Sequence, residues 1–349
     1  MAKPRARDLG IPFEGIPGPL NAITDVGGVE VGMTTLIEGE GVRTGVTAIL
    51  PRGQASSDPV FAGWFSLNGN GEMTGTTWID EAGLLDSPVL ITNTHSVGVV
   101  RDAAIAWAVN RRYLEAGWGL PVVAETFDGA LNDINGFHVK AEHVFSALDG
   151  AKGGPVPEGN VGGGTGMIAY GFKAGTGTAS RRVPDAPWTV GVLVQANHGG
   201  PRLLRIAGVP VGAELANERD ASRSKSIIIV VATDAPLLPH QLKRVAKRAT
   251  HGLARTGAIS SDSSGDIFIA FSTANPGVAS TKPVAQVDML SNAHITAIFQ
   301  STVEATEEAI VNSLIAAETM KGVRGTVCEA IPHERVVEIL RKYGRAEPV

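Results

Sequence analysis

The chain has 349 residues, of which 43% are hydrophobic, 19% are charged and 5% are aromatic. This length allows one large or two ordinary domains with buried cores, and the balance excludes a disordered polyelectrolyte and a membrane bundle. A formal net charge of -5 and a pI near 5.9 give no general attraction to nucleic acid or to an anionic membrane, so neither is expected as a partner.

Runs rich in β-branched residues recur along the chain and predict strands. Several are apolar on both faces, which is typical of a sheet that is covered on both sides by other layers. In chain order these runs are 29–31, 45–50, 88–92, 189–195, 227–231 and 267–271.

Helical periodicity, with apolar residues returning at i, i+3, i+4 and i+7, predicts four helices. They span residues 102–116, 239–255, 302–320 and 333–342. The second has a row of Lys and Arg residues opposite its apolar face. A nucleic-acid-binding helix can show this pattern, but in an acidic chain it is more typical of the solvated side of an amphipathic helix.

Strands that alternate with helices indicate a layered α/β protein, arranged as an α/β/β/α or an α/β/α sandwich. Neither an internal repeat nor a low-complexity linker divides the chain, so we expect a single domain over residues 1–349. Two segments rich in Gly, Thr, Ser and Pro or Arg, 175–188 and 256–265, are predicted to be long loops.

The motifs that would imply a cofactor or a metal are missing from the sequence. The single Cys328 can form neither an internal disulfide nor a multi-cysteine zinc site. The glycine-rich segment 159–166 has neither the ending of a phosphate loop nor dinucleotide-binding spacing, and the eight histidines show no familiar ligand spacing. We therefore expect no cofactor and no metal.

Two features bear on location. The start of the chain is basic but runs on without the apolar stretch of a secretory signal. The longest strongly apolar run, 227–232, is far shorter than the ~20 residues that cross a bilayer. We expect a cytoplasmic protein with no membrane partner.

The segment Ser261 to Asp266, directly before a buried strand, is by composition a loop. A second interpretation is chemical. A hydroxyl at the start of a buried strand can attack the carbonyl that precedes it, pass through an ester and release a new N-terminus. The new α-amine, with an unperturbed pKa of about 7.7–8.0, would then act as the base for its own side chain.

At this segment the sequence resembles the self-processing DmpA/BapA-type peptidase family of L-aminopeptidase/D-esterases and β-aminopeptidases. The resemblance extends over nearly the whole chain and implies a fold shared with the ornithine acetyltransferases. The matching motifs, in order, lie at residues 22–32, 91–98, 124–129, 131–136, 159–167, 192–197, 231–236 and 264–272.

The resemblance implies cleavage between Ser263 and Ser264, with Ser264 as both the cleavage residue and the nucleophile. The mature protein would consist of an α chain, 1–263, and a β chain, 264–349. Members of the family usually have Gly or Asn before the cleaved bond, and this chain has Ser263 instead.

The family also uses a hydroxyl and a glutamate two residues apart, about forty residues after the nucleophile, to assist the amine. Spacing selects Thr302 and Glu304, although the family hydroxyl would be a serine and Ser301 is a competing candidate. Ser301 and Glu304 also have the spacing of a capping box at the start of a helix. Both interpretations of Glu304 stay open at this point.

Further candidates follow patterned segments. Asn197 could donate to the tetrahedral oxyanion of peptide hydrolysis, or it could close a turn. Glu125 could bind the free ammonium group of a substrate. Asn132, Asn135 and Asp234 are candidate substrate-binding residues without separate roles.

Together these observations predict a self-cleaving serine aminopeptidase or amidase that releases N-terminal L-, D- or β-amino acids from short peptides, amides or esters. The resemblance also implies a homo-oligomer of αβ units. One alternative keeps the fold and the self-cleavage but transfers acyl groups or opens polyamide oligomers. The other is a non-catalytic protein that binds small molecules and uses the Ser264 segment only as a turn.

Overall fold

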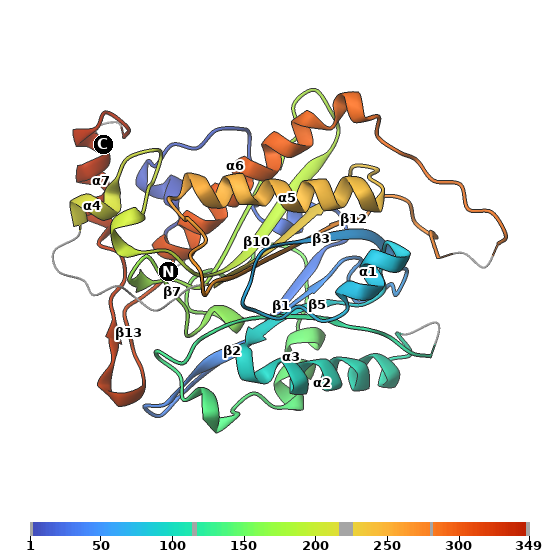
Figure 1. The fold of residues 1–349 in the computed structure, drawn as a ribbon, viewed down its shortest axis with the longest axis horizontal. Helices are drawn as coiled ribbons and strands as arrows, with labels where there is room; N and C mark the ends of the chain where they lie inside the picture. The colour runs from blue at the N-terminus through green and yellow to red at the C-terminus, as the bar shows by residue number, and fades with distance from the viewer. Residues whose placement is uncertain (1–2, 114–116, 216–225, 280–281, 347–349) are drawn as a thin grey trace.

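The computed structural model describes residues 3–113, 117–215, 226–279 and 282–346. Two β-sheets lie face to face (Figure 1), one with strand order β1-β2-β5-β6 and one with order β4-β3-β12-β11-β10-β9. Their strands are β1 (Glu30–Glu38), β2 (Val42–Leu50), β3 (Val60–Gly69), β4 (Leu84–Leu85), β5 (Val89–Asn93), β6 (Val122–Thr126), β9 (Thr176–Arg182), β10 (Thr189–Asn197), β11 (Ser226–Thr233) and β12 (Gly265–Ser272). Two short ribbons pair β7 (Ile168–Ala169) with β8 (Phe172–Lys173), and β13 (Met320–Lys321) with β14 (Val327–Cys328).

Helices cover the outer face of each sheet. Helices α5 and α6 cover the six-stranded sheet, and α2 and α3 cover the four-stranded sheet (Figure 1). The helices are α1 (Thr76–Ala82), α2 (Val97–Asn110), α3 (Ala141–Asp149), α4 (Val211–Leu215), α5 (Pro239–Arg255), α6 (Thr296–Ile315) and α7 (His333–Lys342). The architecture is therefore the α/β/β/α sandwich, the first of the two predicted arrangements.

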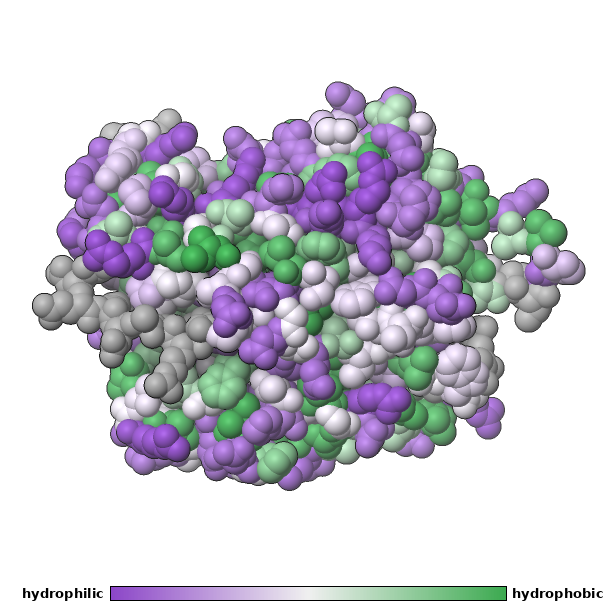
Figure 2. Space-filling model, viewed as in Figure 1, coloured by the Kyte–Doolittle hydropathy of each residue, from purple (hydrophilic) through white to green (hydrophobic). Residues whose placement is uncertain are grey.

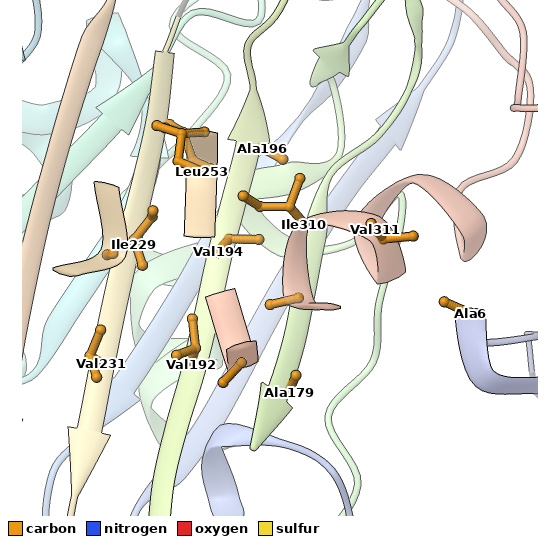
Figure 3. Close-up of a cluster of buried hydrophobic side chains, with 14 of the residues drawn as sticks. Ala6, Ala179, Val192, Val194, Ala196, Ile229, Val231, Leu253, Ile310 and Val311 are labelled. Carbon is orange, nitrogen blue, oxygen red and sulfur yellow. The ribbon is translucent and has the colours of Figure 1, made fainter. Parts of the chain in front are cut away.

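Three apolar layers hold the sandwich together. The middle layer lies between the sheets and joins residues such as Ile91 and Val122 to Ile228 and Ile269. A second layer joins the four-stranded sheet to α2 and α3. The third joins the six-stranded sheet to α5 and α6, and Figure 3 shows part of it. Because β10, β11 and β12 contribute to two of these layers, their side chains are buried on both faces.

All six predicted strands are present, and the helices predicted at 239–255 and 333–342 have those bounds in the structure. The helix predicted at 102–116 is α2, which starts earlier, at Val97. Residues 114–116 of that prediction lie outside the described residues.

Two predictions about element bounds were wrong. The helix predicted at 302–320 is α6, which begins at Thr296 and ends at Ile315. It begins earlier because Ile298 and its neighbours continue the buried face toward the N-terminus, and residue 320 belongs to β13 instead. Ser301 and Glu304 therefore lie inside α6, and they do not form a capping box. The segment 175–188 is not a single long loop, since it contains β9, an edge strand that begins with five small residues and that α6 covers closely.

The basic face of α5 is used within the protein. Lys243 pairs with Asp80 at 3.1 Å, and the guanidinium of Arg248 lies 4.2 Å from the centre of the Phe299 ring. Much of the surface over α5 and α6 is hydrophilic (Figure 2). These contacts favour the solvated-face interpretation of this helix over a nucleic-acid surface.

Candidate active site

Ser264 lies directly before β12, at one end of the six-stranded sheet. In the register of this sheet, Gly265 pairs with Ser226 of β11 on one side and with Gly69 of β3 on the other. Ser264 is buried, and the peptide bond before it adjoins a cavity of about 760 Å³. The cavity is lined by Gly69, Asn70, Gly71, Glu72, Thr94, Glu125, Phe127, Ser226 and Ser263.

Both carbonyl groups at the Ser263–Ser264 bond accept hydrogen bonds from Asn70. The side-chain Nδ2 of Asn70 donates to the Ser263 oxygen at 2.9 Å, and its backbone N–H donates to the Ser264 oxygen at 3.1 Å. The Ser264 N–H donates to the Ser261 carbonyl at 2.9 Å, which closes a tight turn before the bond. Gly265 permits this approach, because a Cβ there would lie 2.4 Å from the Asn70 oxygen.

Asp266 accepts a hydrogen bond from the Ser264 hydroxyl, with 2.5 Å between Oγ and Oδ1. Residues two apart in a strand point to the same face, so the sequence Ser-Gly-Asp brings the two side chains together. Burial raises the pKa of Asp266, and hydrogen bonds from Ser264 and Ser260 offset this only in part. The carboxylate is thus next to the hydroxyl and has a raised affinity for a proton.

Glu125, at the end of β6, is a second buried carboxylate at the cavity. It accepts from the Thr94 hydroxyl at 2.5 Å and from the Glu72 N–H at 3.0 Å. Burial raises its pKa, and these hydrogen bonds counter the shift in part. Gly71 separates Glu125 from the Ser264 segment, since a Cβ on Gly71 would lie 3.1 Å from Oε1 of Glu125 and 3.2 Å from Cα of Gly265. The structure therefore places Glu125 at the same site as Ser264.

Asn197 lies near this site but does not line the cavity. It pairs with Ser226, which in turn pairs with Gly265, so one strand separates Asn197 from β12. Its Nδ2 donates to the Phe127 carbonyl at 2.9 Å, and its Oδ1 accepts from the Ile168 N–H at 2.9 Å. These bonds give Asn197 a role in holding Phe127 at the cavity wall.

The three other candidates for substrate binding lie elsewhere. Asn132 and Asn135 line a different cavity of about 360 Å³, and Oδ1 of Asn132 accepts from the Arg43 N–H. Asp234 follows β11 at the end opposite Ser226, where its Oδ1 accepts from the Thr189 N–H at 2.7 Å. The structure does not bring these three residues together with Ser264, because the ends of patterned segments occur at both ends of a sheet.

The structure also separates Thr302 and Glu304 from Ser264. The Thr302 hydroxyl donates to the Ile298 carbonyl within α6. Glu304 accepts from Gln300 and lies 3.7 Å from Arg181, which pairs with Val190 at the far end of the sheet. Val190 and Asn197 lie seven residues apart in β10, or roughly 20 Å at ~3.3 Å per residue. Spacing in the sequence therefore selected a pair that belongs to the packing of α6.

Sequence reasoning missed the residues that surround the Ser263–Ser264 bond. Asp266 could have been found from the two-residue period of a strand that starts at Ser264. Asn70 and Ser226 had no such signal, because only the pairing of β12 with its two neighbours brings them to this bond. Among the described residues, no group of three His, Cys, Asp or Glu side chains could hold a metal ion.

The fold and the site define a class of protein: a hydrolase with a serine directly before an inner strand of an α/β/β/α sandwich, beside a cavity lined by the acidic residues Glu72 and Glu125. Comparison with known proteins identifies the family. The family model described as "Peptidase family S58" matches residues 21–328. The chain belongs to peptidase family S58.

Similar proteins agree with this assignment. The chain is 55% identical to the β-peptidyl aminopeptidase BapA of Sphingosinicella microcystinivorans over 98% of this chain and 93% of that protein. A solved structure of a Burkholderia sp. β-aminopeptidase has a TM-score of 0.92 and 52% identity over 99% of this chain and 100% of that chain. The L-aminopeptidase D-Ala-esterase/amidase of Ochrobactrum anthropi, described as a variant of the Ntn hydrolase fold, has a TM-score of 0.93 and 51% identity with the same coverage.

Proposed function

We propose that this protein is a serine aminopeptidase of the N-terminal-nucleophile class, made as a precursor that cuts itself between Ser263 and Ser264. The observation that supports this most directly is the geometry of that bond. The bond lies at a cavity, its carbonyl accepts from Nδ2 of Asn70, and the Ser264 hydroxyl is held by a carboxylate. The products are an α chain, 1–263, and a β chain, 264–349.

In the mature enzyme the Ser264 hydroxyl attacks the carbonyl of a substrate. The free α-amine of Ser264 takes the proton from Oγ, and later gives it to the leaving amine. Nδ2 of Asn70, which points at the carbonyl of the precursor, stabilises the oxyanion that forms in the same place. Water then hydrolyses the acyl-enzyme and frees Ser264.

Glu125 selects substrates with a free amino end. Its carboxylate lies at the wall of the cavity, and within the lining of this cavity the charged side chains are Glu72 and Glu125, both acidic. An ammonium group placed there would gain a charge-assisted hydrogen bond, whereas a substrate carboxylate would be repelled. The substrates are therefore short peptides, amides or esters with a free N-terminus. The similarity to β-aminopeptidases adds β-amino acids to the residues that the enzyme releases.

Intact mass measurement tests the self-cleavage. Wild-type protein should give two chains, and Ser264→Ala should stay as one chain of 36.2 kDa without activity. Ser261→Ala is the matched control, because Ser261 lies exposed in the same turn and contributes its backbone carbonyl to the turn. A Ser264→Ala protein that still splits at this bond would exclude the mechanism.

Assembly and location belong to the same proposal. The αβ units form a homo-oligomer, which native mass spectrometry can test. No helix in the described part of the chain is long and apolar enough to cross a membrane. We propose a cytoplasmic location, which fits a sequence with one cysteine, Cys328, and therefore no internal disulfide. Cell fractionation can test it.

A further inference from the structure

A segment with several apolar residues leaves the body of the molecule between β12 and α6. Residues 283–289 are all exposed, and Figure 1 shows this part of the chain projecting beyond the two sheets and their helices. The segment contains Val284, Val287 and Met289, with 76%, 40% and 50% of their surface exposed, and Figure 2 shows hydrophobic residues on this projection. Single exposed apolar side chains are common on protein surfaces, but three in one projecting run form a patch. We call residues 283–289 the arm.

The base of the arm is held firmly against the body of the molecule. Nδ2 of Asn275 donates to the Asp288 carbonyl at 3.0 Å, and Oδ1 of Asn275 accepts from the Asp288 N–H at 2.7 Å, so one side chain joins the two sides of the excursion. Asn275 adopts a φ of 56°, a conformation that asparagine tolerates better than most residues. Leu290 is buried, and its N–H donates to the Pro236 carbonyl at 2.7 Å. These bonds fix the direction in which the arm leaves the molecule, so its apolar residues are held in water and away from the core.

Further exposed apolar side chains lie at the end of the molecule from which the arm projects. β12 begins beside Ser264, and β6 ends near it, where Glu125 lies, so the end of β12 and the start of β6 are both at the opposite end. There, Trp118 precedes β6 and packs edge-on against Trp78 of α1, with 5.7 Å between the ring centres, and about half of its surface is exposed. Val109, at the C-terminal end of α2, is also exposed. Figure 1 shows α1, this end of α2 and the arm on the same side of the molecule.

We propose that the arm of one copy lies on this end of a second copy, against Trp118 and Val109, and that a two-fold axis relates the two copies. Under such an axis each copy gives its arm and receives the other, so the same contact forms twice. A second copy fits better than an unrelated protein, because apolar residues held in water need a partner that is always present, and because one chain carries both the arm and an apolar surface for it. Tryptophan and methionine are also enriched in the buried centre of protein interfaces. This inference rests on the homo-oligomer of the proposed function and names a surface that forms it.

The position of the arm has two consequences for the processed enzyme. The arm belongs to the β chain and Trp118 to the α chain, so the contact joins the β chain of one copy to the α chain of the other. Seven extended residues span at most about 25 Å, which is enough to lie along one face of a neighbouring domain. Because the arm projects from the end opposite Ser264, this contact leaves the substrate cavity open. We therefore expect changes in the arm to alter the size of the assembly and to leave self-cleavage intact.

The first test compares the association of wild type with that of the double variant Val284→Asp/Val287→Asp. Carboxylates on the arm are costly to bury without a partner, so the dissociation constant between copies should rise by about 100-fold or more. Native mass spectrometry and size-exclusion chromatography with light scattering, over a range of protein concentrations, measure this shift. Val327→Asp is the matched control, because Val327 is similarly exposed but lies in the β13–β14 ribbon, on the opposite side of the molecule from the arm (Figure 1). It should assemble like wild type.

The second test identifies the partner of the arm. Val287 is replaced by the photo-reactive residue p-benzoylphenylalanine in the uncut Ser264→Ala chain, where a cross-link between two copies doubles the mass and a cross-link within one copy leaves it unchanged. We expect the doubled mass, with the cross-link mapped by peptide mass spectrometry to the peptides that contain Trp118 or Val109.

The results separate the arm contact from the proposed function. An oligomeric wild type whose assembly the double variant leaves unchanged, or a shift of equal size in Val327→Asp, would overturn the arm contact alone, and so would cross-links confined to one copy. A monomeric wild type would contradict the homo-oligomer itself, and the arm contact with it. Thermal unfolding checks the fold of the double variant, and if that variant does not fold, the cross-linking result decides. Intact mass shows in parallel whether the variant still splits between Ser263 and Ser264, which tests self-cleavage independently of assembly.

Discussion

The two ends of the six-stranded sheet hold buried carboxylates in opposite electrostatic surroundings. At the Arg181 end, Glu308 is fully buried and accepts from Arg7 at 2.8 Å and from Arg181 at 2.7 Å. Burial alone would raise the pKa of Glu308, but these hydrogen bonds and charges outweigh it, and the pKa is lowered. At the Ser264 end, Glu125 and Asp266 have hydroxyl and amide donors instead, and burial raises both pKa values.

This difference distinguishes carboxylates that stabilise the fold from carboxylates that can take part in a reaction. A buried carboxylate that is paired with cations stays ionised and fixes its neighbours, so it has no affinity left for a reacting proton. A buried carboxylate without a cation is unstable when ionised, which makes it a stronger base and a ready partner for an ammonium group. The spacing of residues in the sequence does not distinguish these two kinds of carboxylate, whereas the presence or absence of a cation partner in the structure does.

Removing the proposed oxyanion donor, Asn70, should have the largest effect on substrate hydrolysis among the changes that keep Ser264. We expect Asn70→Ala to lower kcat for amide hydrolysis by about 10²–10³-fold, because Nδ2 points at the position where negative charge develops. Steady-state kinetics on amino acid p-nitroanilides would measure this. An unchanged kcat would show that another group stabilises the oxyanion.

Neutralising the carboxylate of the cavity should have an intermediate effect that depends on the substrate. Glu125→Gln should raise KM for substrates with a free amine by about 10–100-fold, the loss of one charge-assisted hydrogen bond of roughly 1.5–3 kcal/mol. N-acetylated analogues serve as the control, since they have no ammonium group to lose. An equal change for both substrate series would argue against an ammonium contact.

The same variant should not lose thermal stability at neutral pH. The pKa of Glu125 is raised in the folded state, so its ionised form disfavours folding once the pH exceeds the unfolded-state pKa. We therefore expect the Tm of Glu125→Gln at pH 7 to equal or exceed that of wild type. A lower Tm would show that the carboxylate stabilises the fold.

At the Arg181 end of the sheet, replacing a buried glutamate with glutamine should have the opposite effect on stability. Glu308→Gln should destabilise the protein by about 3–5 kcal/mol, because it leaves the buried Arg181 with only its longer contact to Glu304, at 3.7 Å. The pKa of Glu308 is lowered, so its contribution is present above the unfolded-state pKa and is lost as the pH falls through the folded-state pKa. Urea unfolding at pH 7 and pH 4 would show a difference between the two proteins that shrinks at the lower pH.

The smallest effect on activity is expected from Thr302 and Glu304, the pair that was predicted from its spacing after Ser264. Thr302→Ala and Glu304→Gln should leave kcat within about twofold of wild type, since both side chains contact α6 or Arg181 and lie far from Ser264. Kinetics on the same p-nitroanilides would detect a larger change. A hundredfold loss of kcat in either variant, with an unchanged Tm, would show that the residue takes part in catalysis.

The sequence predicted most of the fold and only part of the site. Buried strands and amphipathic helices have local periods, so the strands and the layered class could be predicted from short windows. Ser264 and Glu125, which the structure brings to the same end of the six-stranded sheet, were predicted from motifs that are contiguous in the chain. Asn70 was not, because its contact with Ser263 depends on β3 lying beside β12, a pairing of segments far apart in the sequence. Glu304 was predicted near Ser264 but lies at the Arg181 end, since a fixed spacing in the sequence says nothing about which end of a sheet a helix residue reaches.

The central claim is that activity belongs to molecules in which Ser264 has become the first residue of a chain. N-terminal sequencing of purified protein, combined with titration of active sites by a serine-directed acylating reagent, tests it most directly. The account predicts one Ser-Gly-Asp terminus for each titrated site, with the label on the fragment that begins at Ser264. Stoichiometric labelling and full activity in an uncut chain would contradict it.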